Sequence, residues 1–217
     1  MMINRSKRLI PAIVTVTLGA MLILTAAPSF SGDPLQEIRD IYAAVNKTIE
    51  EKKAQVILFY TSDKGWKEAK DPEQKEFKDI DEMDAFERNY VYLHDGRIIK
   101  VRMALETPSG DWMLVRDYYF YDNGRTAFVF DDLATFQGYV PDHDEIEGPY
   151  VVEKRVYFDA KGKQVKALKK AFVKATGQEI SAEHVRQVGE DVEVLAEMRA
   201  FAFYRMLRKG LIRSNAP

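Results

Sequence analysis

Hydrophobic and polar residues alternate with two different periods along this chain. From Pro34 to about Lys53, apolar residues recur every three or four positions, which is typical of a helix with one buried face. Asp33 stands just before Pro34, and this pair marks a helix start because aspartate caps the helix and proline suits its first position. The pattern predicts an amphipathic helix that covers the rest of the fold.

Three later segments change to a period of two and share one layout. Each has an aromatic-rich run, a turn that ends in glycine, a basic residue and a second run. The units are YVYLHDGRIIKV, YYFYDNGRTAFV and VYFDAKGKQVKA, aligned on Gly96, Gly124 and Gly162. Asp-Gly and Asn-Gly favour two-residue hairpin turns, whereas Lys-Gly suits a longer, bulged turn. With QVILFYT at residues 55–61, the units predict about seven strands.

Two more segments complete the predicted fold. Residues 63–88 hold 16 charged residues among 26, which predicts a solvated loop. Apolar residues return at helical spacing from Ser181 and end near Gly210, so a C-terminal helix is expected there. The predicted class is therefore α+β, with an N-terminal helix packed on an antiparallel β-meander of about seven strands and a C-terminal helix.

Strand alternation sorts the hairpin side chains onto two faces if all turns have two residues. One face is apolar in all three units and should form the core under the N-terminal helix. It collects Tyr90, Tyr92, Ile99, Val101, Tyr118, Phe120, Ala127, Val129, Val156, Phe158, Val165 and Ala167. The other face collects Val91, Leu93 and Ile98 together with polar residues and an aromatic strip, defined here as Tyr119, Tyr121, Phe128 and Tyr157. Three covers for this strip are open: the C-terminal helix, a partner protein or a ligand.

The N-terminal 31 residues have the pattern of a signal peptide. Three basic residues and no acid precede an almost wholly apolar run over residues 9–27, and small residues follow it. We expect cleavage before Gly32, which leaves residues 32–217 as a single domain in the periplasm or outside the cell. Because the apolar run is longer than usual, an uncleaved anchor in the inner membrane, facing the periplasm, is the alternative. In that case only the N-terminal segment would contact the membrane.

Composition excludes several kinds of chemistry. The chain has no cysteine, which removes disulfides, thiolate nucleophiles and a lipid anchor on cysteine. Residues 32–217 carry 29 basic and 34 acidic residues, a net charge of 29 − 34 = −5, which argues against a nucleic-acid partner. We find no cofactor motif, and the three histidines have no metal-site spacing.

One acidic cluster keeps a rival hypothesis open. Residues 141–148 read PDHDEIEG, and Asp131 and Asp132 precede the same loop. Closely spaced carboxylates suit a weak calcium site or a carboxylate-dependent hydrolase. The spacing does not match an EF-hand loop, so no metal is assigned.

The hairpin units resemble the aromatic-strand, Asn-Gly and basic-residue repeats of MORN-like hairpin proteins. More broadly, an N-terminal export signal followed by IRDIYAAVNKTIE and YYFYDNGRTAFVF resembles uncharacterised exported bacterial proteins. This resemblance implies a location and no activity.

These observations favour a non-enzymatic periplasmic module without a cofactor. We expect it to bind an envelope protein or a small apolar ligand through the aromatic strip, because tyrosine offers a large rigid body with a polar tip. The alternatives are the hydrolase and a structural envelope protein that self-associates through its C-terminal helix. The oligomeric state is left open.

Overall fold

A computed structural model describes the protein at residues 33–62, 64–69, 87–107, 109–136, 148–183, 185 and 193–214, with side chains to Lys209. Its described elements are the helices α1 (Pro34–Glu50), η1 (Met198–Ala200) and α3 (Tyr204–Ser214), and the strands β1 (Gln55–Ser62), β2 (Gly65–Glu68), β3 (Glu87–His94), β4 (Arg97–Glu106), β5 (Trp112–Phe120), β6 (Thr126–Thr135), β7 (Tyr150–Phe158), β8 (Gln164–Val173) and β9 (Glu179–Ile180). The predicted export signal and the cluster at 141–147 lie outside the described residues.

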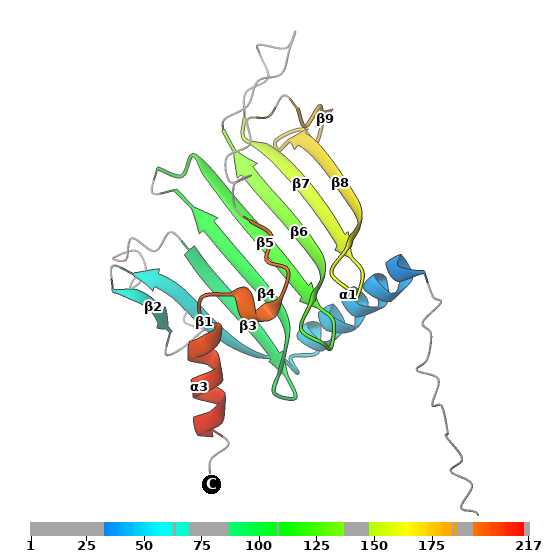
Figure 1. Ribbon diagram of the computed structural model, residues 1–217. Coiled ribbons are helices and arrows are strands. Elements are labelled where there is room, and N and C mark those ends of the chain that lie inside the picture. The colour runs from blue at the N-terminus through cyan, green and yellow to red at the C-terminus, as the bar shows by residue number, and fades with distance from the viewer. Residues whose placement is uncertain are drawn as a thin grey trace, which may run out of the picture. The chain divides into compact units, whose positions relative to one another are not determined.

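The strands form one antiparallel sheet in the order β2-β1-β3-β4-β5-β6-β7-β8-β9 (Figure 1). The α+β class and the meander are confirmed, and seven of the nine strands are those predicted. The other two are short. β2 lies inside the segment predicted as a solvated loop, where it pairs with the end of β1, and β9 pairs with two residues of β8.

The predicted N-terminal helix is α1. Asp33 caps it, because its Oδ1 accepts a hydrogen bond from the backbone N of Leu35 at 3.0 Å. Ile38 and Val45, two turns apart on one face, are buried against the sheet. The helix ends at Glu50, a few residues earlier than predicted.

The three hairpin turns differ in length: the first has two residues, and the second and third have three. His94 pairs with Arg97 around a two-residue turn, in which Asp95 and Gly96 have φ of 50° and 71°. The second turn is longer by one residue, because the N of Tyr121 donates to the carbonyl of Arg125 across three intervening residues at 2.9 Å. The third turn follows the same plan, as the weaker Lys-Gly signal predicted.

The first hairpin has the two-residue turn that was assumed, but the extra residue Ile99 on β4 shifts the pairing beyond it by one position, and this reverses the faces of β3 relative to β4. Val91, not Tyr92, therefore lies in register with Val101 and Tyr118. The predicted placement of Tyr90 and Tyr92 on the Tyr118 face is wrong, as is that of Val91, Leu93 and Ile98 on the opposite face.

Each hairpin also contains a bulge at the same place. One extra residue on the outgoing strand stands three positions after the glycine; these residues are Ile99, Ala127 and Val165. A bulge shifts the following side chains relative to plain alternation. Ile99 and Ala127 consequently join the cluster around Tyr119, and their predicted placement beside Tyr118 is wrong.

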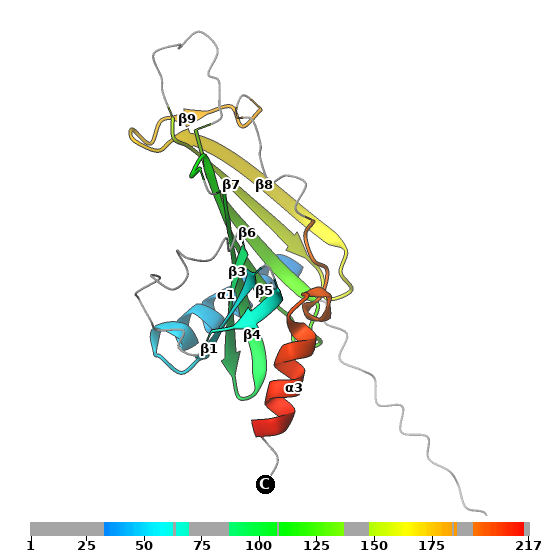
Figure 2. The same ribbon diagram turned by 90° about the vertical axis from the view of Figure 1, so that its left-hand side faces the viewer.

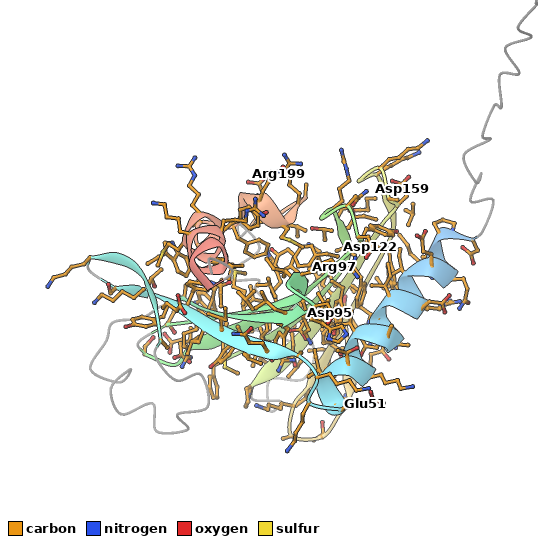
Figure 3. All side chains as sticks on the ribbon, turned by 90° about the horizontal axis from the view of Figure 1, so that it is seen from below. Glu51, Asp95, Arg97, Asp122, Asp159 and Arg199 are labelled. Carbon is orange, nitrogen blue, oxygen red and sulfur yellow. The ribbon has the colours of Figure 1, made fainter. Side chains whose placement is uncertain are left out.

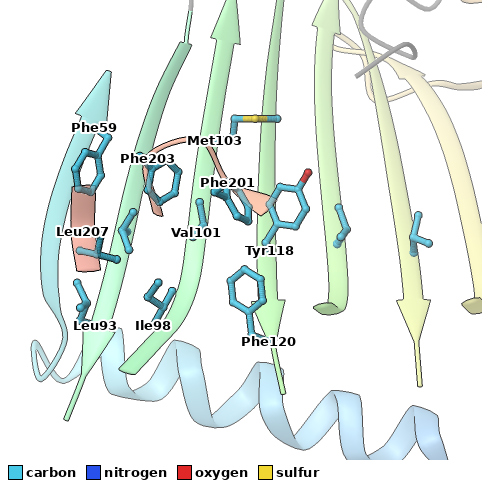
Figure 4. Close-up of a cluster of buried hydrophobic side chains, with 13 residues drawn as sticks. Phe59, Leu93, Ile98, Val101, Met103, Tyr118, Phe120, Phe201, Phe203 and Leu207 are labelled. Carbon is cyan, nitrogen blue, oxygen red and sulfur yellow. The ribbon is translucent and has the colours of Figure 1, made fainter. Parts of the chain in front are cut away.

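The sheet has apolar residues on both faces, and each face has its own cover. Figure 2 shows α1 on one side of the sheet and α3 on the other. We call the side beneath α1 the helix face. The opposite side is the strap face, because residues 193–203, the strap, cross it. Its main cluster joins Phe59, Val101 and Tyr118 of the sheet to Phe201 and Phe203 (Figure 4).

The predicted C-terminal helix is confirmed as α3, but its predicted start near Ser181 is wrong. The described residues of this segment are turn, extended strap and η1, and a helix begins only at Tyr204. Phe201 and Phe203 are both buried while Ala202 between them is exposed, which is the two-residue spacing of an extended chain. Gly210, the predicted stop, lies inside α3. None of the described helices is both long and apolar enough to cross a membrane.

Candidate functional site

The structure gathers the four residues of the aromatic strip on the helix face. Phe128 stands between Tyr119 and Tyr157, with ring centroids 5.6 and 4.9 Å away. Tyr121 belongs to the same buried cluster, and its hydroxyl donates to the carbonyl of Phe158 at 2.8 Å. The sequence therefore placed these four side chains together correctly.

The cover of the strip is not among the three expected: it is α1, so the prediction that the N-terminal helix lies on the Tyr118 face is wrong. Ile38 and Val45 of α1 pack on it, and they leave Tyr119 only 2% and Phe128 only 6% exposed. The expectation that the C-terminal helix covers the strip is wrong, since that part of the chain lies on the opposite face. Only Tyr157 is half-buried. The accessible part of the strip is thus its Tyr157 end.

A hollow of about 280 Å³ opens beside α1 at this end. Its lining joins aromatic rings to two guanidinium groups; the residues are Ile38, Arg39, Tyr42, Phe128, Phe130, Arg155 and Tyr157. The Arg155 guanidinium lies 5.4 Å from the centre of the Phe130 ring and also donates to Glu153 at 3.0 Å. Such a site presents apolar surface with positive charge at its rim.

A second, more polar hollow of about 540 Å³ adjoins the first, because Tyr42 and Phe130 line both. At its base Asp117 binds two cations. Lys100 Nζ lies 2.8 Å from Asp117 Oδ2, and Arg102 donates to both carboxylate oxygens at 2.8 and 2.9 Å. One carboxylate and two cations leave this group with one net positive charge.

A chain of hydrogen bonds links that group to α1. Lys100 Nζ donates to the Tyr119 hydroxyl at 3.0 Å, and this hydroxyl donates to Asn46 Oδ1 at 3.2 Å. Burial lowers the pKa of Lys100, although the Asp117 charge opposes the shift. Burial, together with the Asp117 charge, raises the pKa of Tyr119, so its hydroxyl stays neutral and remains a donor. The network therefore fixes α1 on the sheet through neutral and charged donors.

The strap face carries its own buried ion pair and hollow. Arg116 donates to both carboxylate oxygens of Asp131 at 2.6 and 2.9 Å, and to the strap carbonyl of Glu193 at 3.2 Å. Trp66 and Met103 help to line a hollow of about 460 Å³ between the strap and the sheet. The sheet and the strap are thus joined by charge as well as by apolar contact.

This geometry bears on the rival hydrolase and calcium hypotheses. Asp131 is held by Arg116, whereas Asp132 is in register with Val115 and exposed. Neighbouring residues of a strand point to opposite faces, so the two carboxylates do not meet. Across the described part of the chain, no group of three or more histidine, aspartate or glutamate side chains could hold a metal ion. His143 and His184 lie outside that part.

The charged group on the helix face was missed from the sequence. Lys100, Arg102 and Asp117 each occupy a strand position in phase with aromatic residues, and this was the available signal. These three side chains meet only in the observed pairing register of β4 with β5, which the sequence pattern alone does not specify. Searches of family models, curated proteins and solved structures gave no match to the chain.

Proposed function

We propose that the protein is a non-enzymatic binding module of the periplasm that holds a small apolar ligand bearing an acidic group. The groove beside α1 is the binding site. The observation that carries the proposal is the hollow at the Tyr157 end of the aromatic strip, with arginines at its rim. Small-molecule sites are usually concave and apolar with a few placed polar groups, which is the composition of this hollow.

The lining suggests how such a ligand would lie. Its apolar body would contact the rings of Phe128, Phe130 and Tyr157, and its acidic group would bind Arg155 or Arg39. Guanidinium groups suit carboxylate, sulfonate and phosphate because they donate two parallel hydrogen bonds. A hollow of about 280 Å³ is just smaller than most small-ligand sites, whose volumes begin at ~300 Å³. The adjoining polar hollow gives a longer ligand room to extend past Tyr42.

The polar groups of the groove favour binding over hydrolysis. Among the described lining residues of the two hollows, the carboxylates are Glu50 and Asp117. Asp117 is held by two cations, so both of its carboxylate oxygens are already engaged in ion pairs. The groove thus presents donors to a ligand and holds its central carboxylate in ion pairs.

The proposal is tested with two fluorescent probes of similar size, one an anilinonaphthalene sulfonate and the other uncharged phenylnaphthylamine. We expect the sulfonate to bind more tightly, and Arg155→Gln to weaken it by about tenfold, the value of one charge-assisted hydrogen bond. Tyr42→Ala should weaken both probes. Arg199→Gln and Phe136→Ala are matched controls, since both side chains are exposed outside the groove. Equal binding by all variants would refute the proposed site.

The choice of variants follows from burial. Truncating Tyr119 and Phe128 together would remove binding only by unfolding the cluster, because both are core residues. Arg155 and the control residue Arg199, which lies apart from α1 (Figure 3), are exposed, so their replacement should leave the unfolding transition unchanged. Tyr42 is 46% exposed, but its ring centroid lies 5.1 and 5.8 Å from those of Tyr119 and Phe128, so Tyr42→Ala should lower the free energy of unfolding by about 1 kcal/mol. Urea denaturation of each variant separates lost binding from lost folding.

A further inference from the structure

One edge of the sheet carries a dense positive charge that the proposed function does not use. Residues 160–178 contain six lysines and no acidic residue, although the whole chain has a net charge of −2. Five of these lysines lie on or beside β8, and all six are exposed: Lys161, Lys163, Lys166, Lys169, Lys170 and Lys174. On the neighbouring strand, Lys154 and Arg155 stand in register with Lys169 and Leu168. The charge is therefore concentrated on one side of a mildly acidic protein.

The same edge exposes apolar side chains. Val165 is 39% and Leu168 is 42% exposed, and all the other residues from Gln164 to Lys170 are exposed as well. β8 is the last long strand of the sheet (Figure 1), and β9 pairs only with Ala171 and Phe172. Within the described ranges, no strand covers the outer edge of β8 from Gln164 to Lys170. Exposed lysines and apolar residues are thus interspersed along an open edge of the sheet.

Carboxylates border this edge without neutralising it. Glu153 is in register with Lys170, but it also accepts a hydrogen bond from Arg155. Asp159 binds the backbone N atoms of Lys161 and Lys163, both at 2.9 Å, inside the turn. Glu179 stands on β9 opposite Phe172. Among the described residues, the six lysines and Lys154 outnumber these three carboxylates together with Asp132, which lies near Lys174.

We propose that the β8 edge, residues 161–174, docks the protein on the surface of an anionic phospholipid membrane. Lysines near such a surface are attracted by its negative potential, and exposed Val165 and Leu168 can enter the boundary between headgroups and acyl chains. Lysine stems are long enough to bring charges from both faces of an edge strand to one plane. An added peptide strand is less suited, because lysines along an edge oppose strand pairing. This surface is separate from any signal or anchor at the N-terminus.

The absence of cysteine from the chain makes a local test available. In the full chain, Leu168→Cys would be labelled with an environment-sensitive dye, and Ser109→Cys, in an exposed turn between β4 and β5, would be labelled in a parallel sample. We expect the dye at position 168 to brighten with phosphatidylglycerol vesicles, and to change little with phosphatidylcholine vesicles. The dye at position 109 should stay unchanged, so insertion of the N-terminal segment alone cannot produce the signal.

A charge-matched pair of variants completes the experiment. Lys163→Gln, Lys166→Gln and Lys170→Gln together should lower the apparent affinity at position 168 on the order of a hundredfold, because each lysine near an anionic surface contributes roughly fivefold. Removing the exposed Lys52, Lys64 and Lys209 in the same way should have a far smaller effect. An unchanged dye, equal brightening with both lipids or equal loss in both triple variants would overturn the proposal. Brightening with polyglutamate and not with vesicles would also overturn it, and would point to an acidic peptide.

Discussion

The two faces of the sheet are both apolar near the hairpin turns, yet they are covered by different means. On the strap face, an extended segment inserts Phe201 and Phe203 between sheet residues and adds backbone hydrogen bonds, such as Met198 N to Gly124 O at 2.9 Å. On the helix face, α1 lies over the aromatic strip and is joined to it through Asn46 and Tyr119.

The difference lies in how closely each cover can follow a twisted surface. An extended chain offers backbone donors and acceptors to the sheet, whereas a helix has already used its own. A straight helix on a twisted sheet touches it along one line and leaves space on either side. The two adjoining hollows on the helix face border α1, and a third hollow lies between the strap and the sheet, so neither cover fills its face completely. The strap is held beside its hollow by hydrogen bonds to Gly124, Thr126 and Arg116, whereas the hollows beside α1 open next to exposed Tyr42 and Arg155. We infer that the strap chiefly stabilises the fold and that the space beside α1 is free for binding.

The different contributions of the strap and of α1 to stability are tested most directly by truncating one large residue in each. Phe203→Ala should cost about 3–5 kcal/mol of the free energy of unfolding, because the ring is 1% exposed and stacks on Phe59 at 5.0 Å. Ile38→Ala in α1 should cost less, about 2 kcal/mol, because it removes a smaller buried side chain, and both residues border a hollow into which the site can relax. Urea unfolding measures both. The reverse order would show that α1 is the tighter cover.

A smaller effect tests the hydrogen bonds of the strap. Thr126 is 1% exposed, and its Oγ1 donates to the carbonyl of Leu195 at 2.6 Å. Thr126→Val keeps the shape and leaves that carbonyl unpaired, so we expect a loss of about 1–2 kcal/mol in urea unfolding. Thr48→Val is the matched control, because Thr48 Oγ1 donates within α1 at an exposed position. Equal losses in the two variants would contradict a special role for the strap.

The smallest effect concerns the pH dependence of the helix face. Burial raises the pKa of Tyr121 to about 12, from an ordinary value of 10.0. Between these values the unfolded chain has lost the proton and the folded chain keeps it, so stability is present below pH ~10 and falls as pH rises toward ~12. Tyr121→Phe should flatten part of this fall, measured as unfolding free energy at several pH values. An identical slope in both proteins would refute the assignment to Tyr121.

Local patterns were enough to predict much of the fold. Helical spacing after Asp33 identified α1, and the glycine-centred units identified six strands with their antiparallel order. Period-two alternation also grouped the aromatic strip correctly, because the longer turn and the extra residue Ala127 offset each other in the second hairpin, so Tyr119 still pairs with Phe128. Features that depend on residues close together in the chain could therefore be predicted from the sequence.

Features that depend on strand register and on contacts between distant parts of the chain could not be predicted from the sequence. The faces of β3 depended on the extra residue Ile99 in the pairing with β4, and the cover of each face depended on which distant segment packs on it. Phe201 and Phe203 fit a helical pattern as well as an extended one, so only contact with Phe59 and Tyr118 decides between them. The pairing of Lys100 and Arg102 with Asp117 required the register of β4 with β5.

The simple strand order has a consequence for how the chain assembles. Each strand from β1 to β8 pairs with neighbours nearby in sequence, so during synthesis α1 and the hairpins can form as they emerge. The strap face must wait, because Phe201, Phe203 and Leu207 come last and dock on strands made much earlier. A chain that has not yet reached residues 201–207 therefore exposes Phe59, Tyr118 and their neighbours to solvent, and it is most prone to aggregate in that interval.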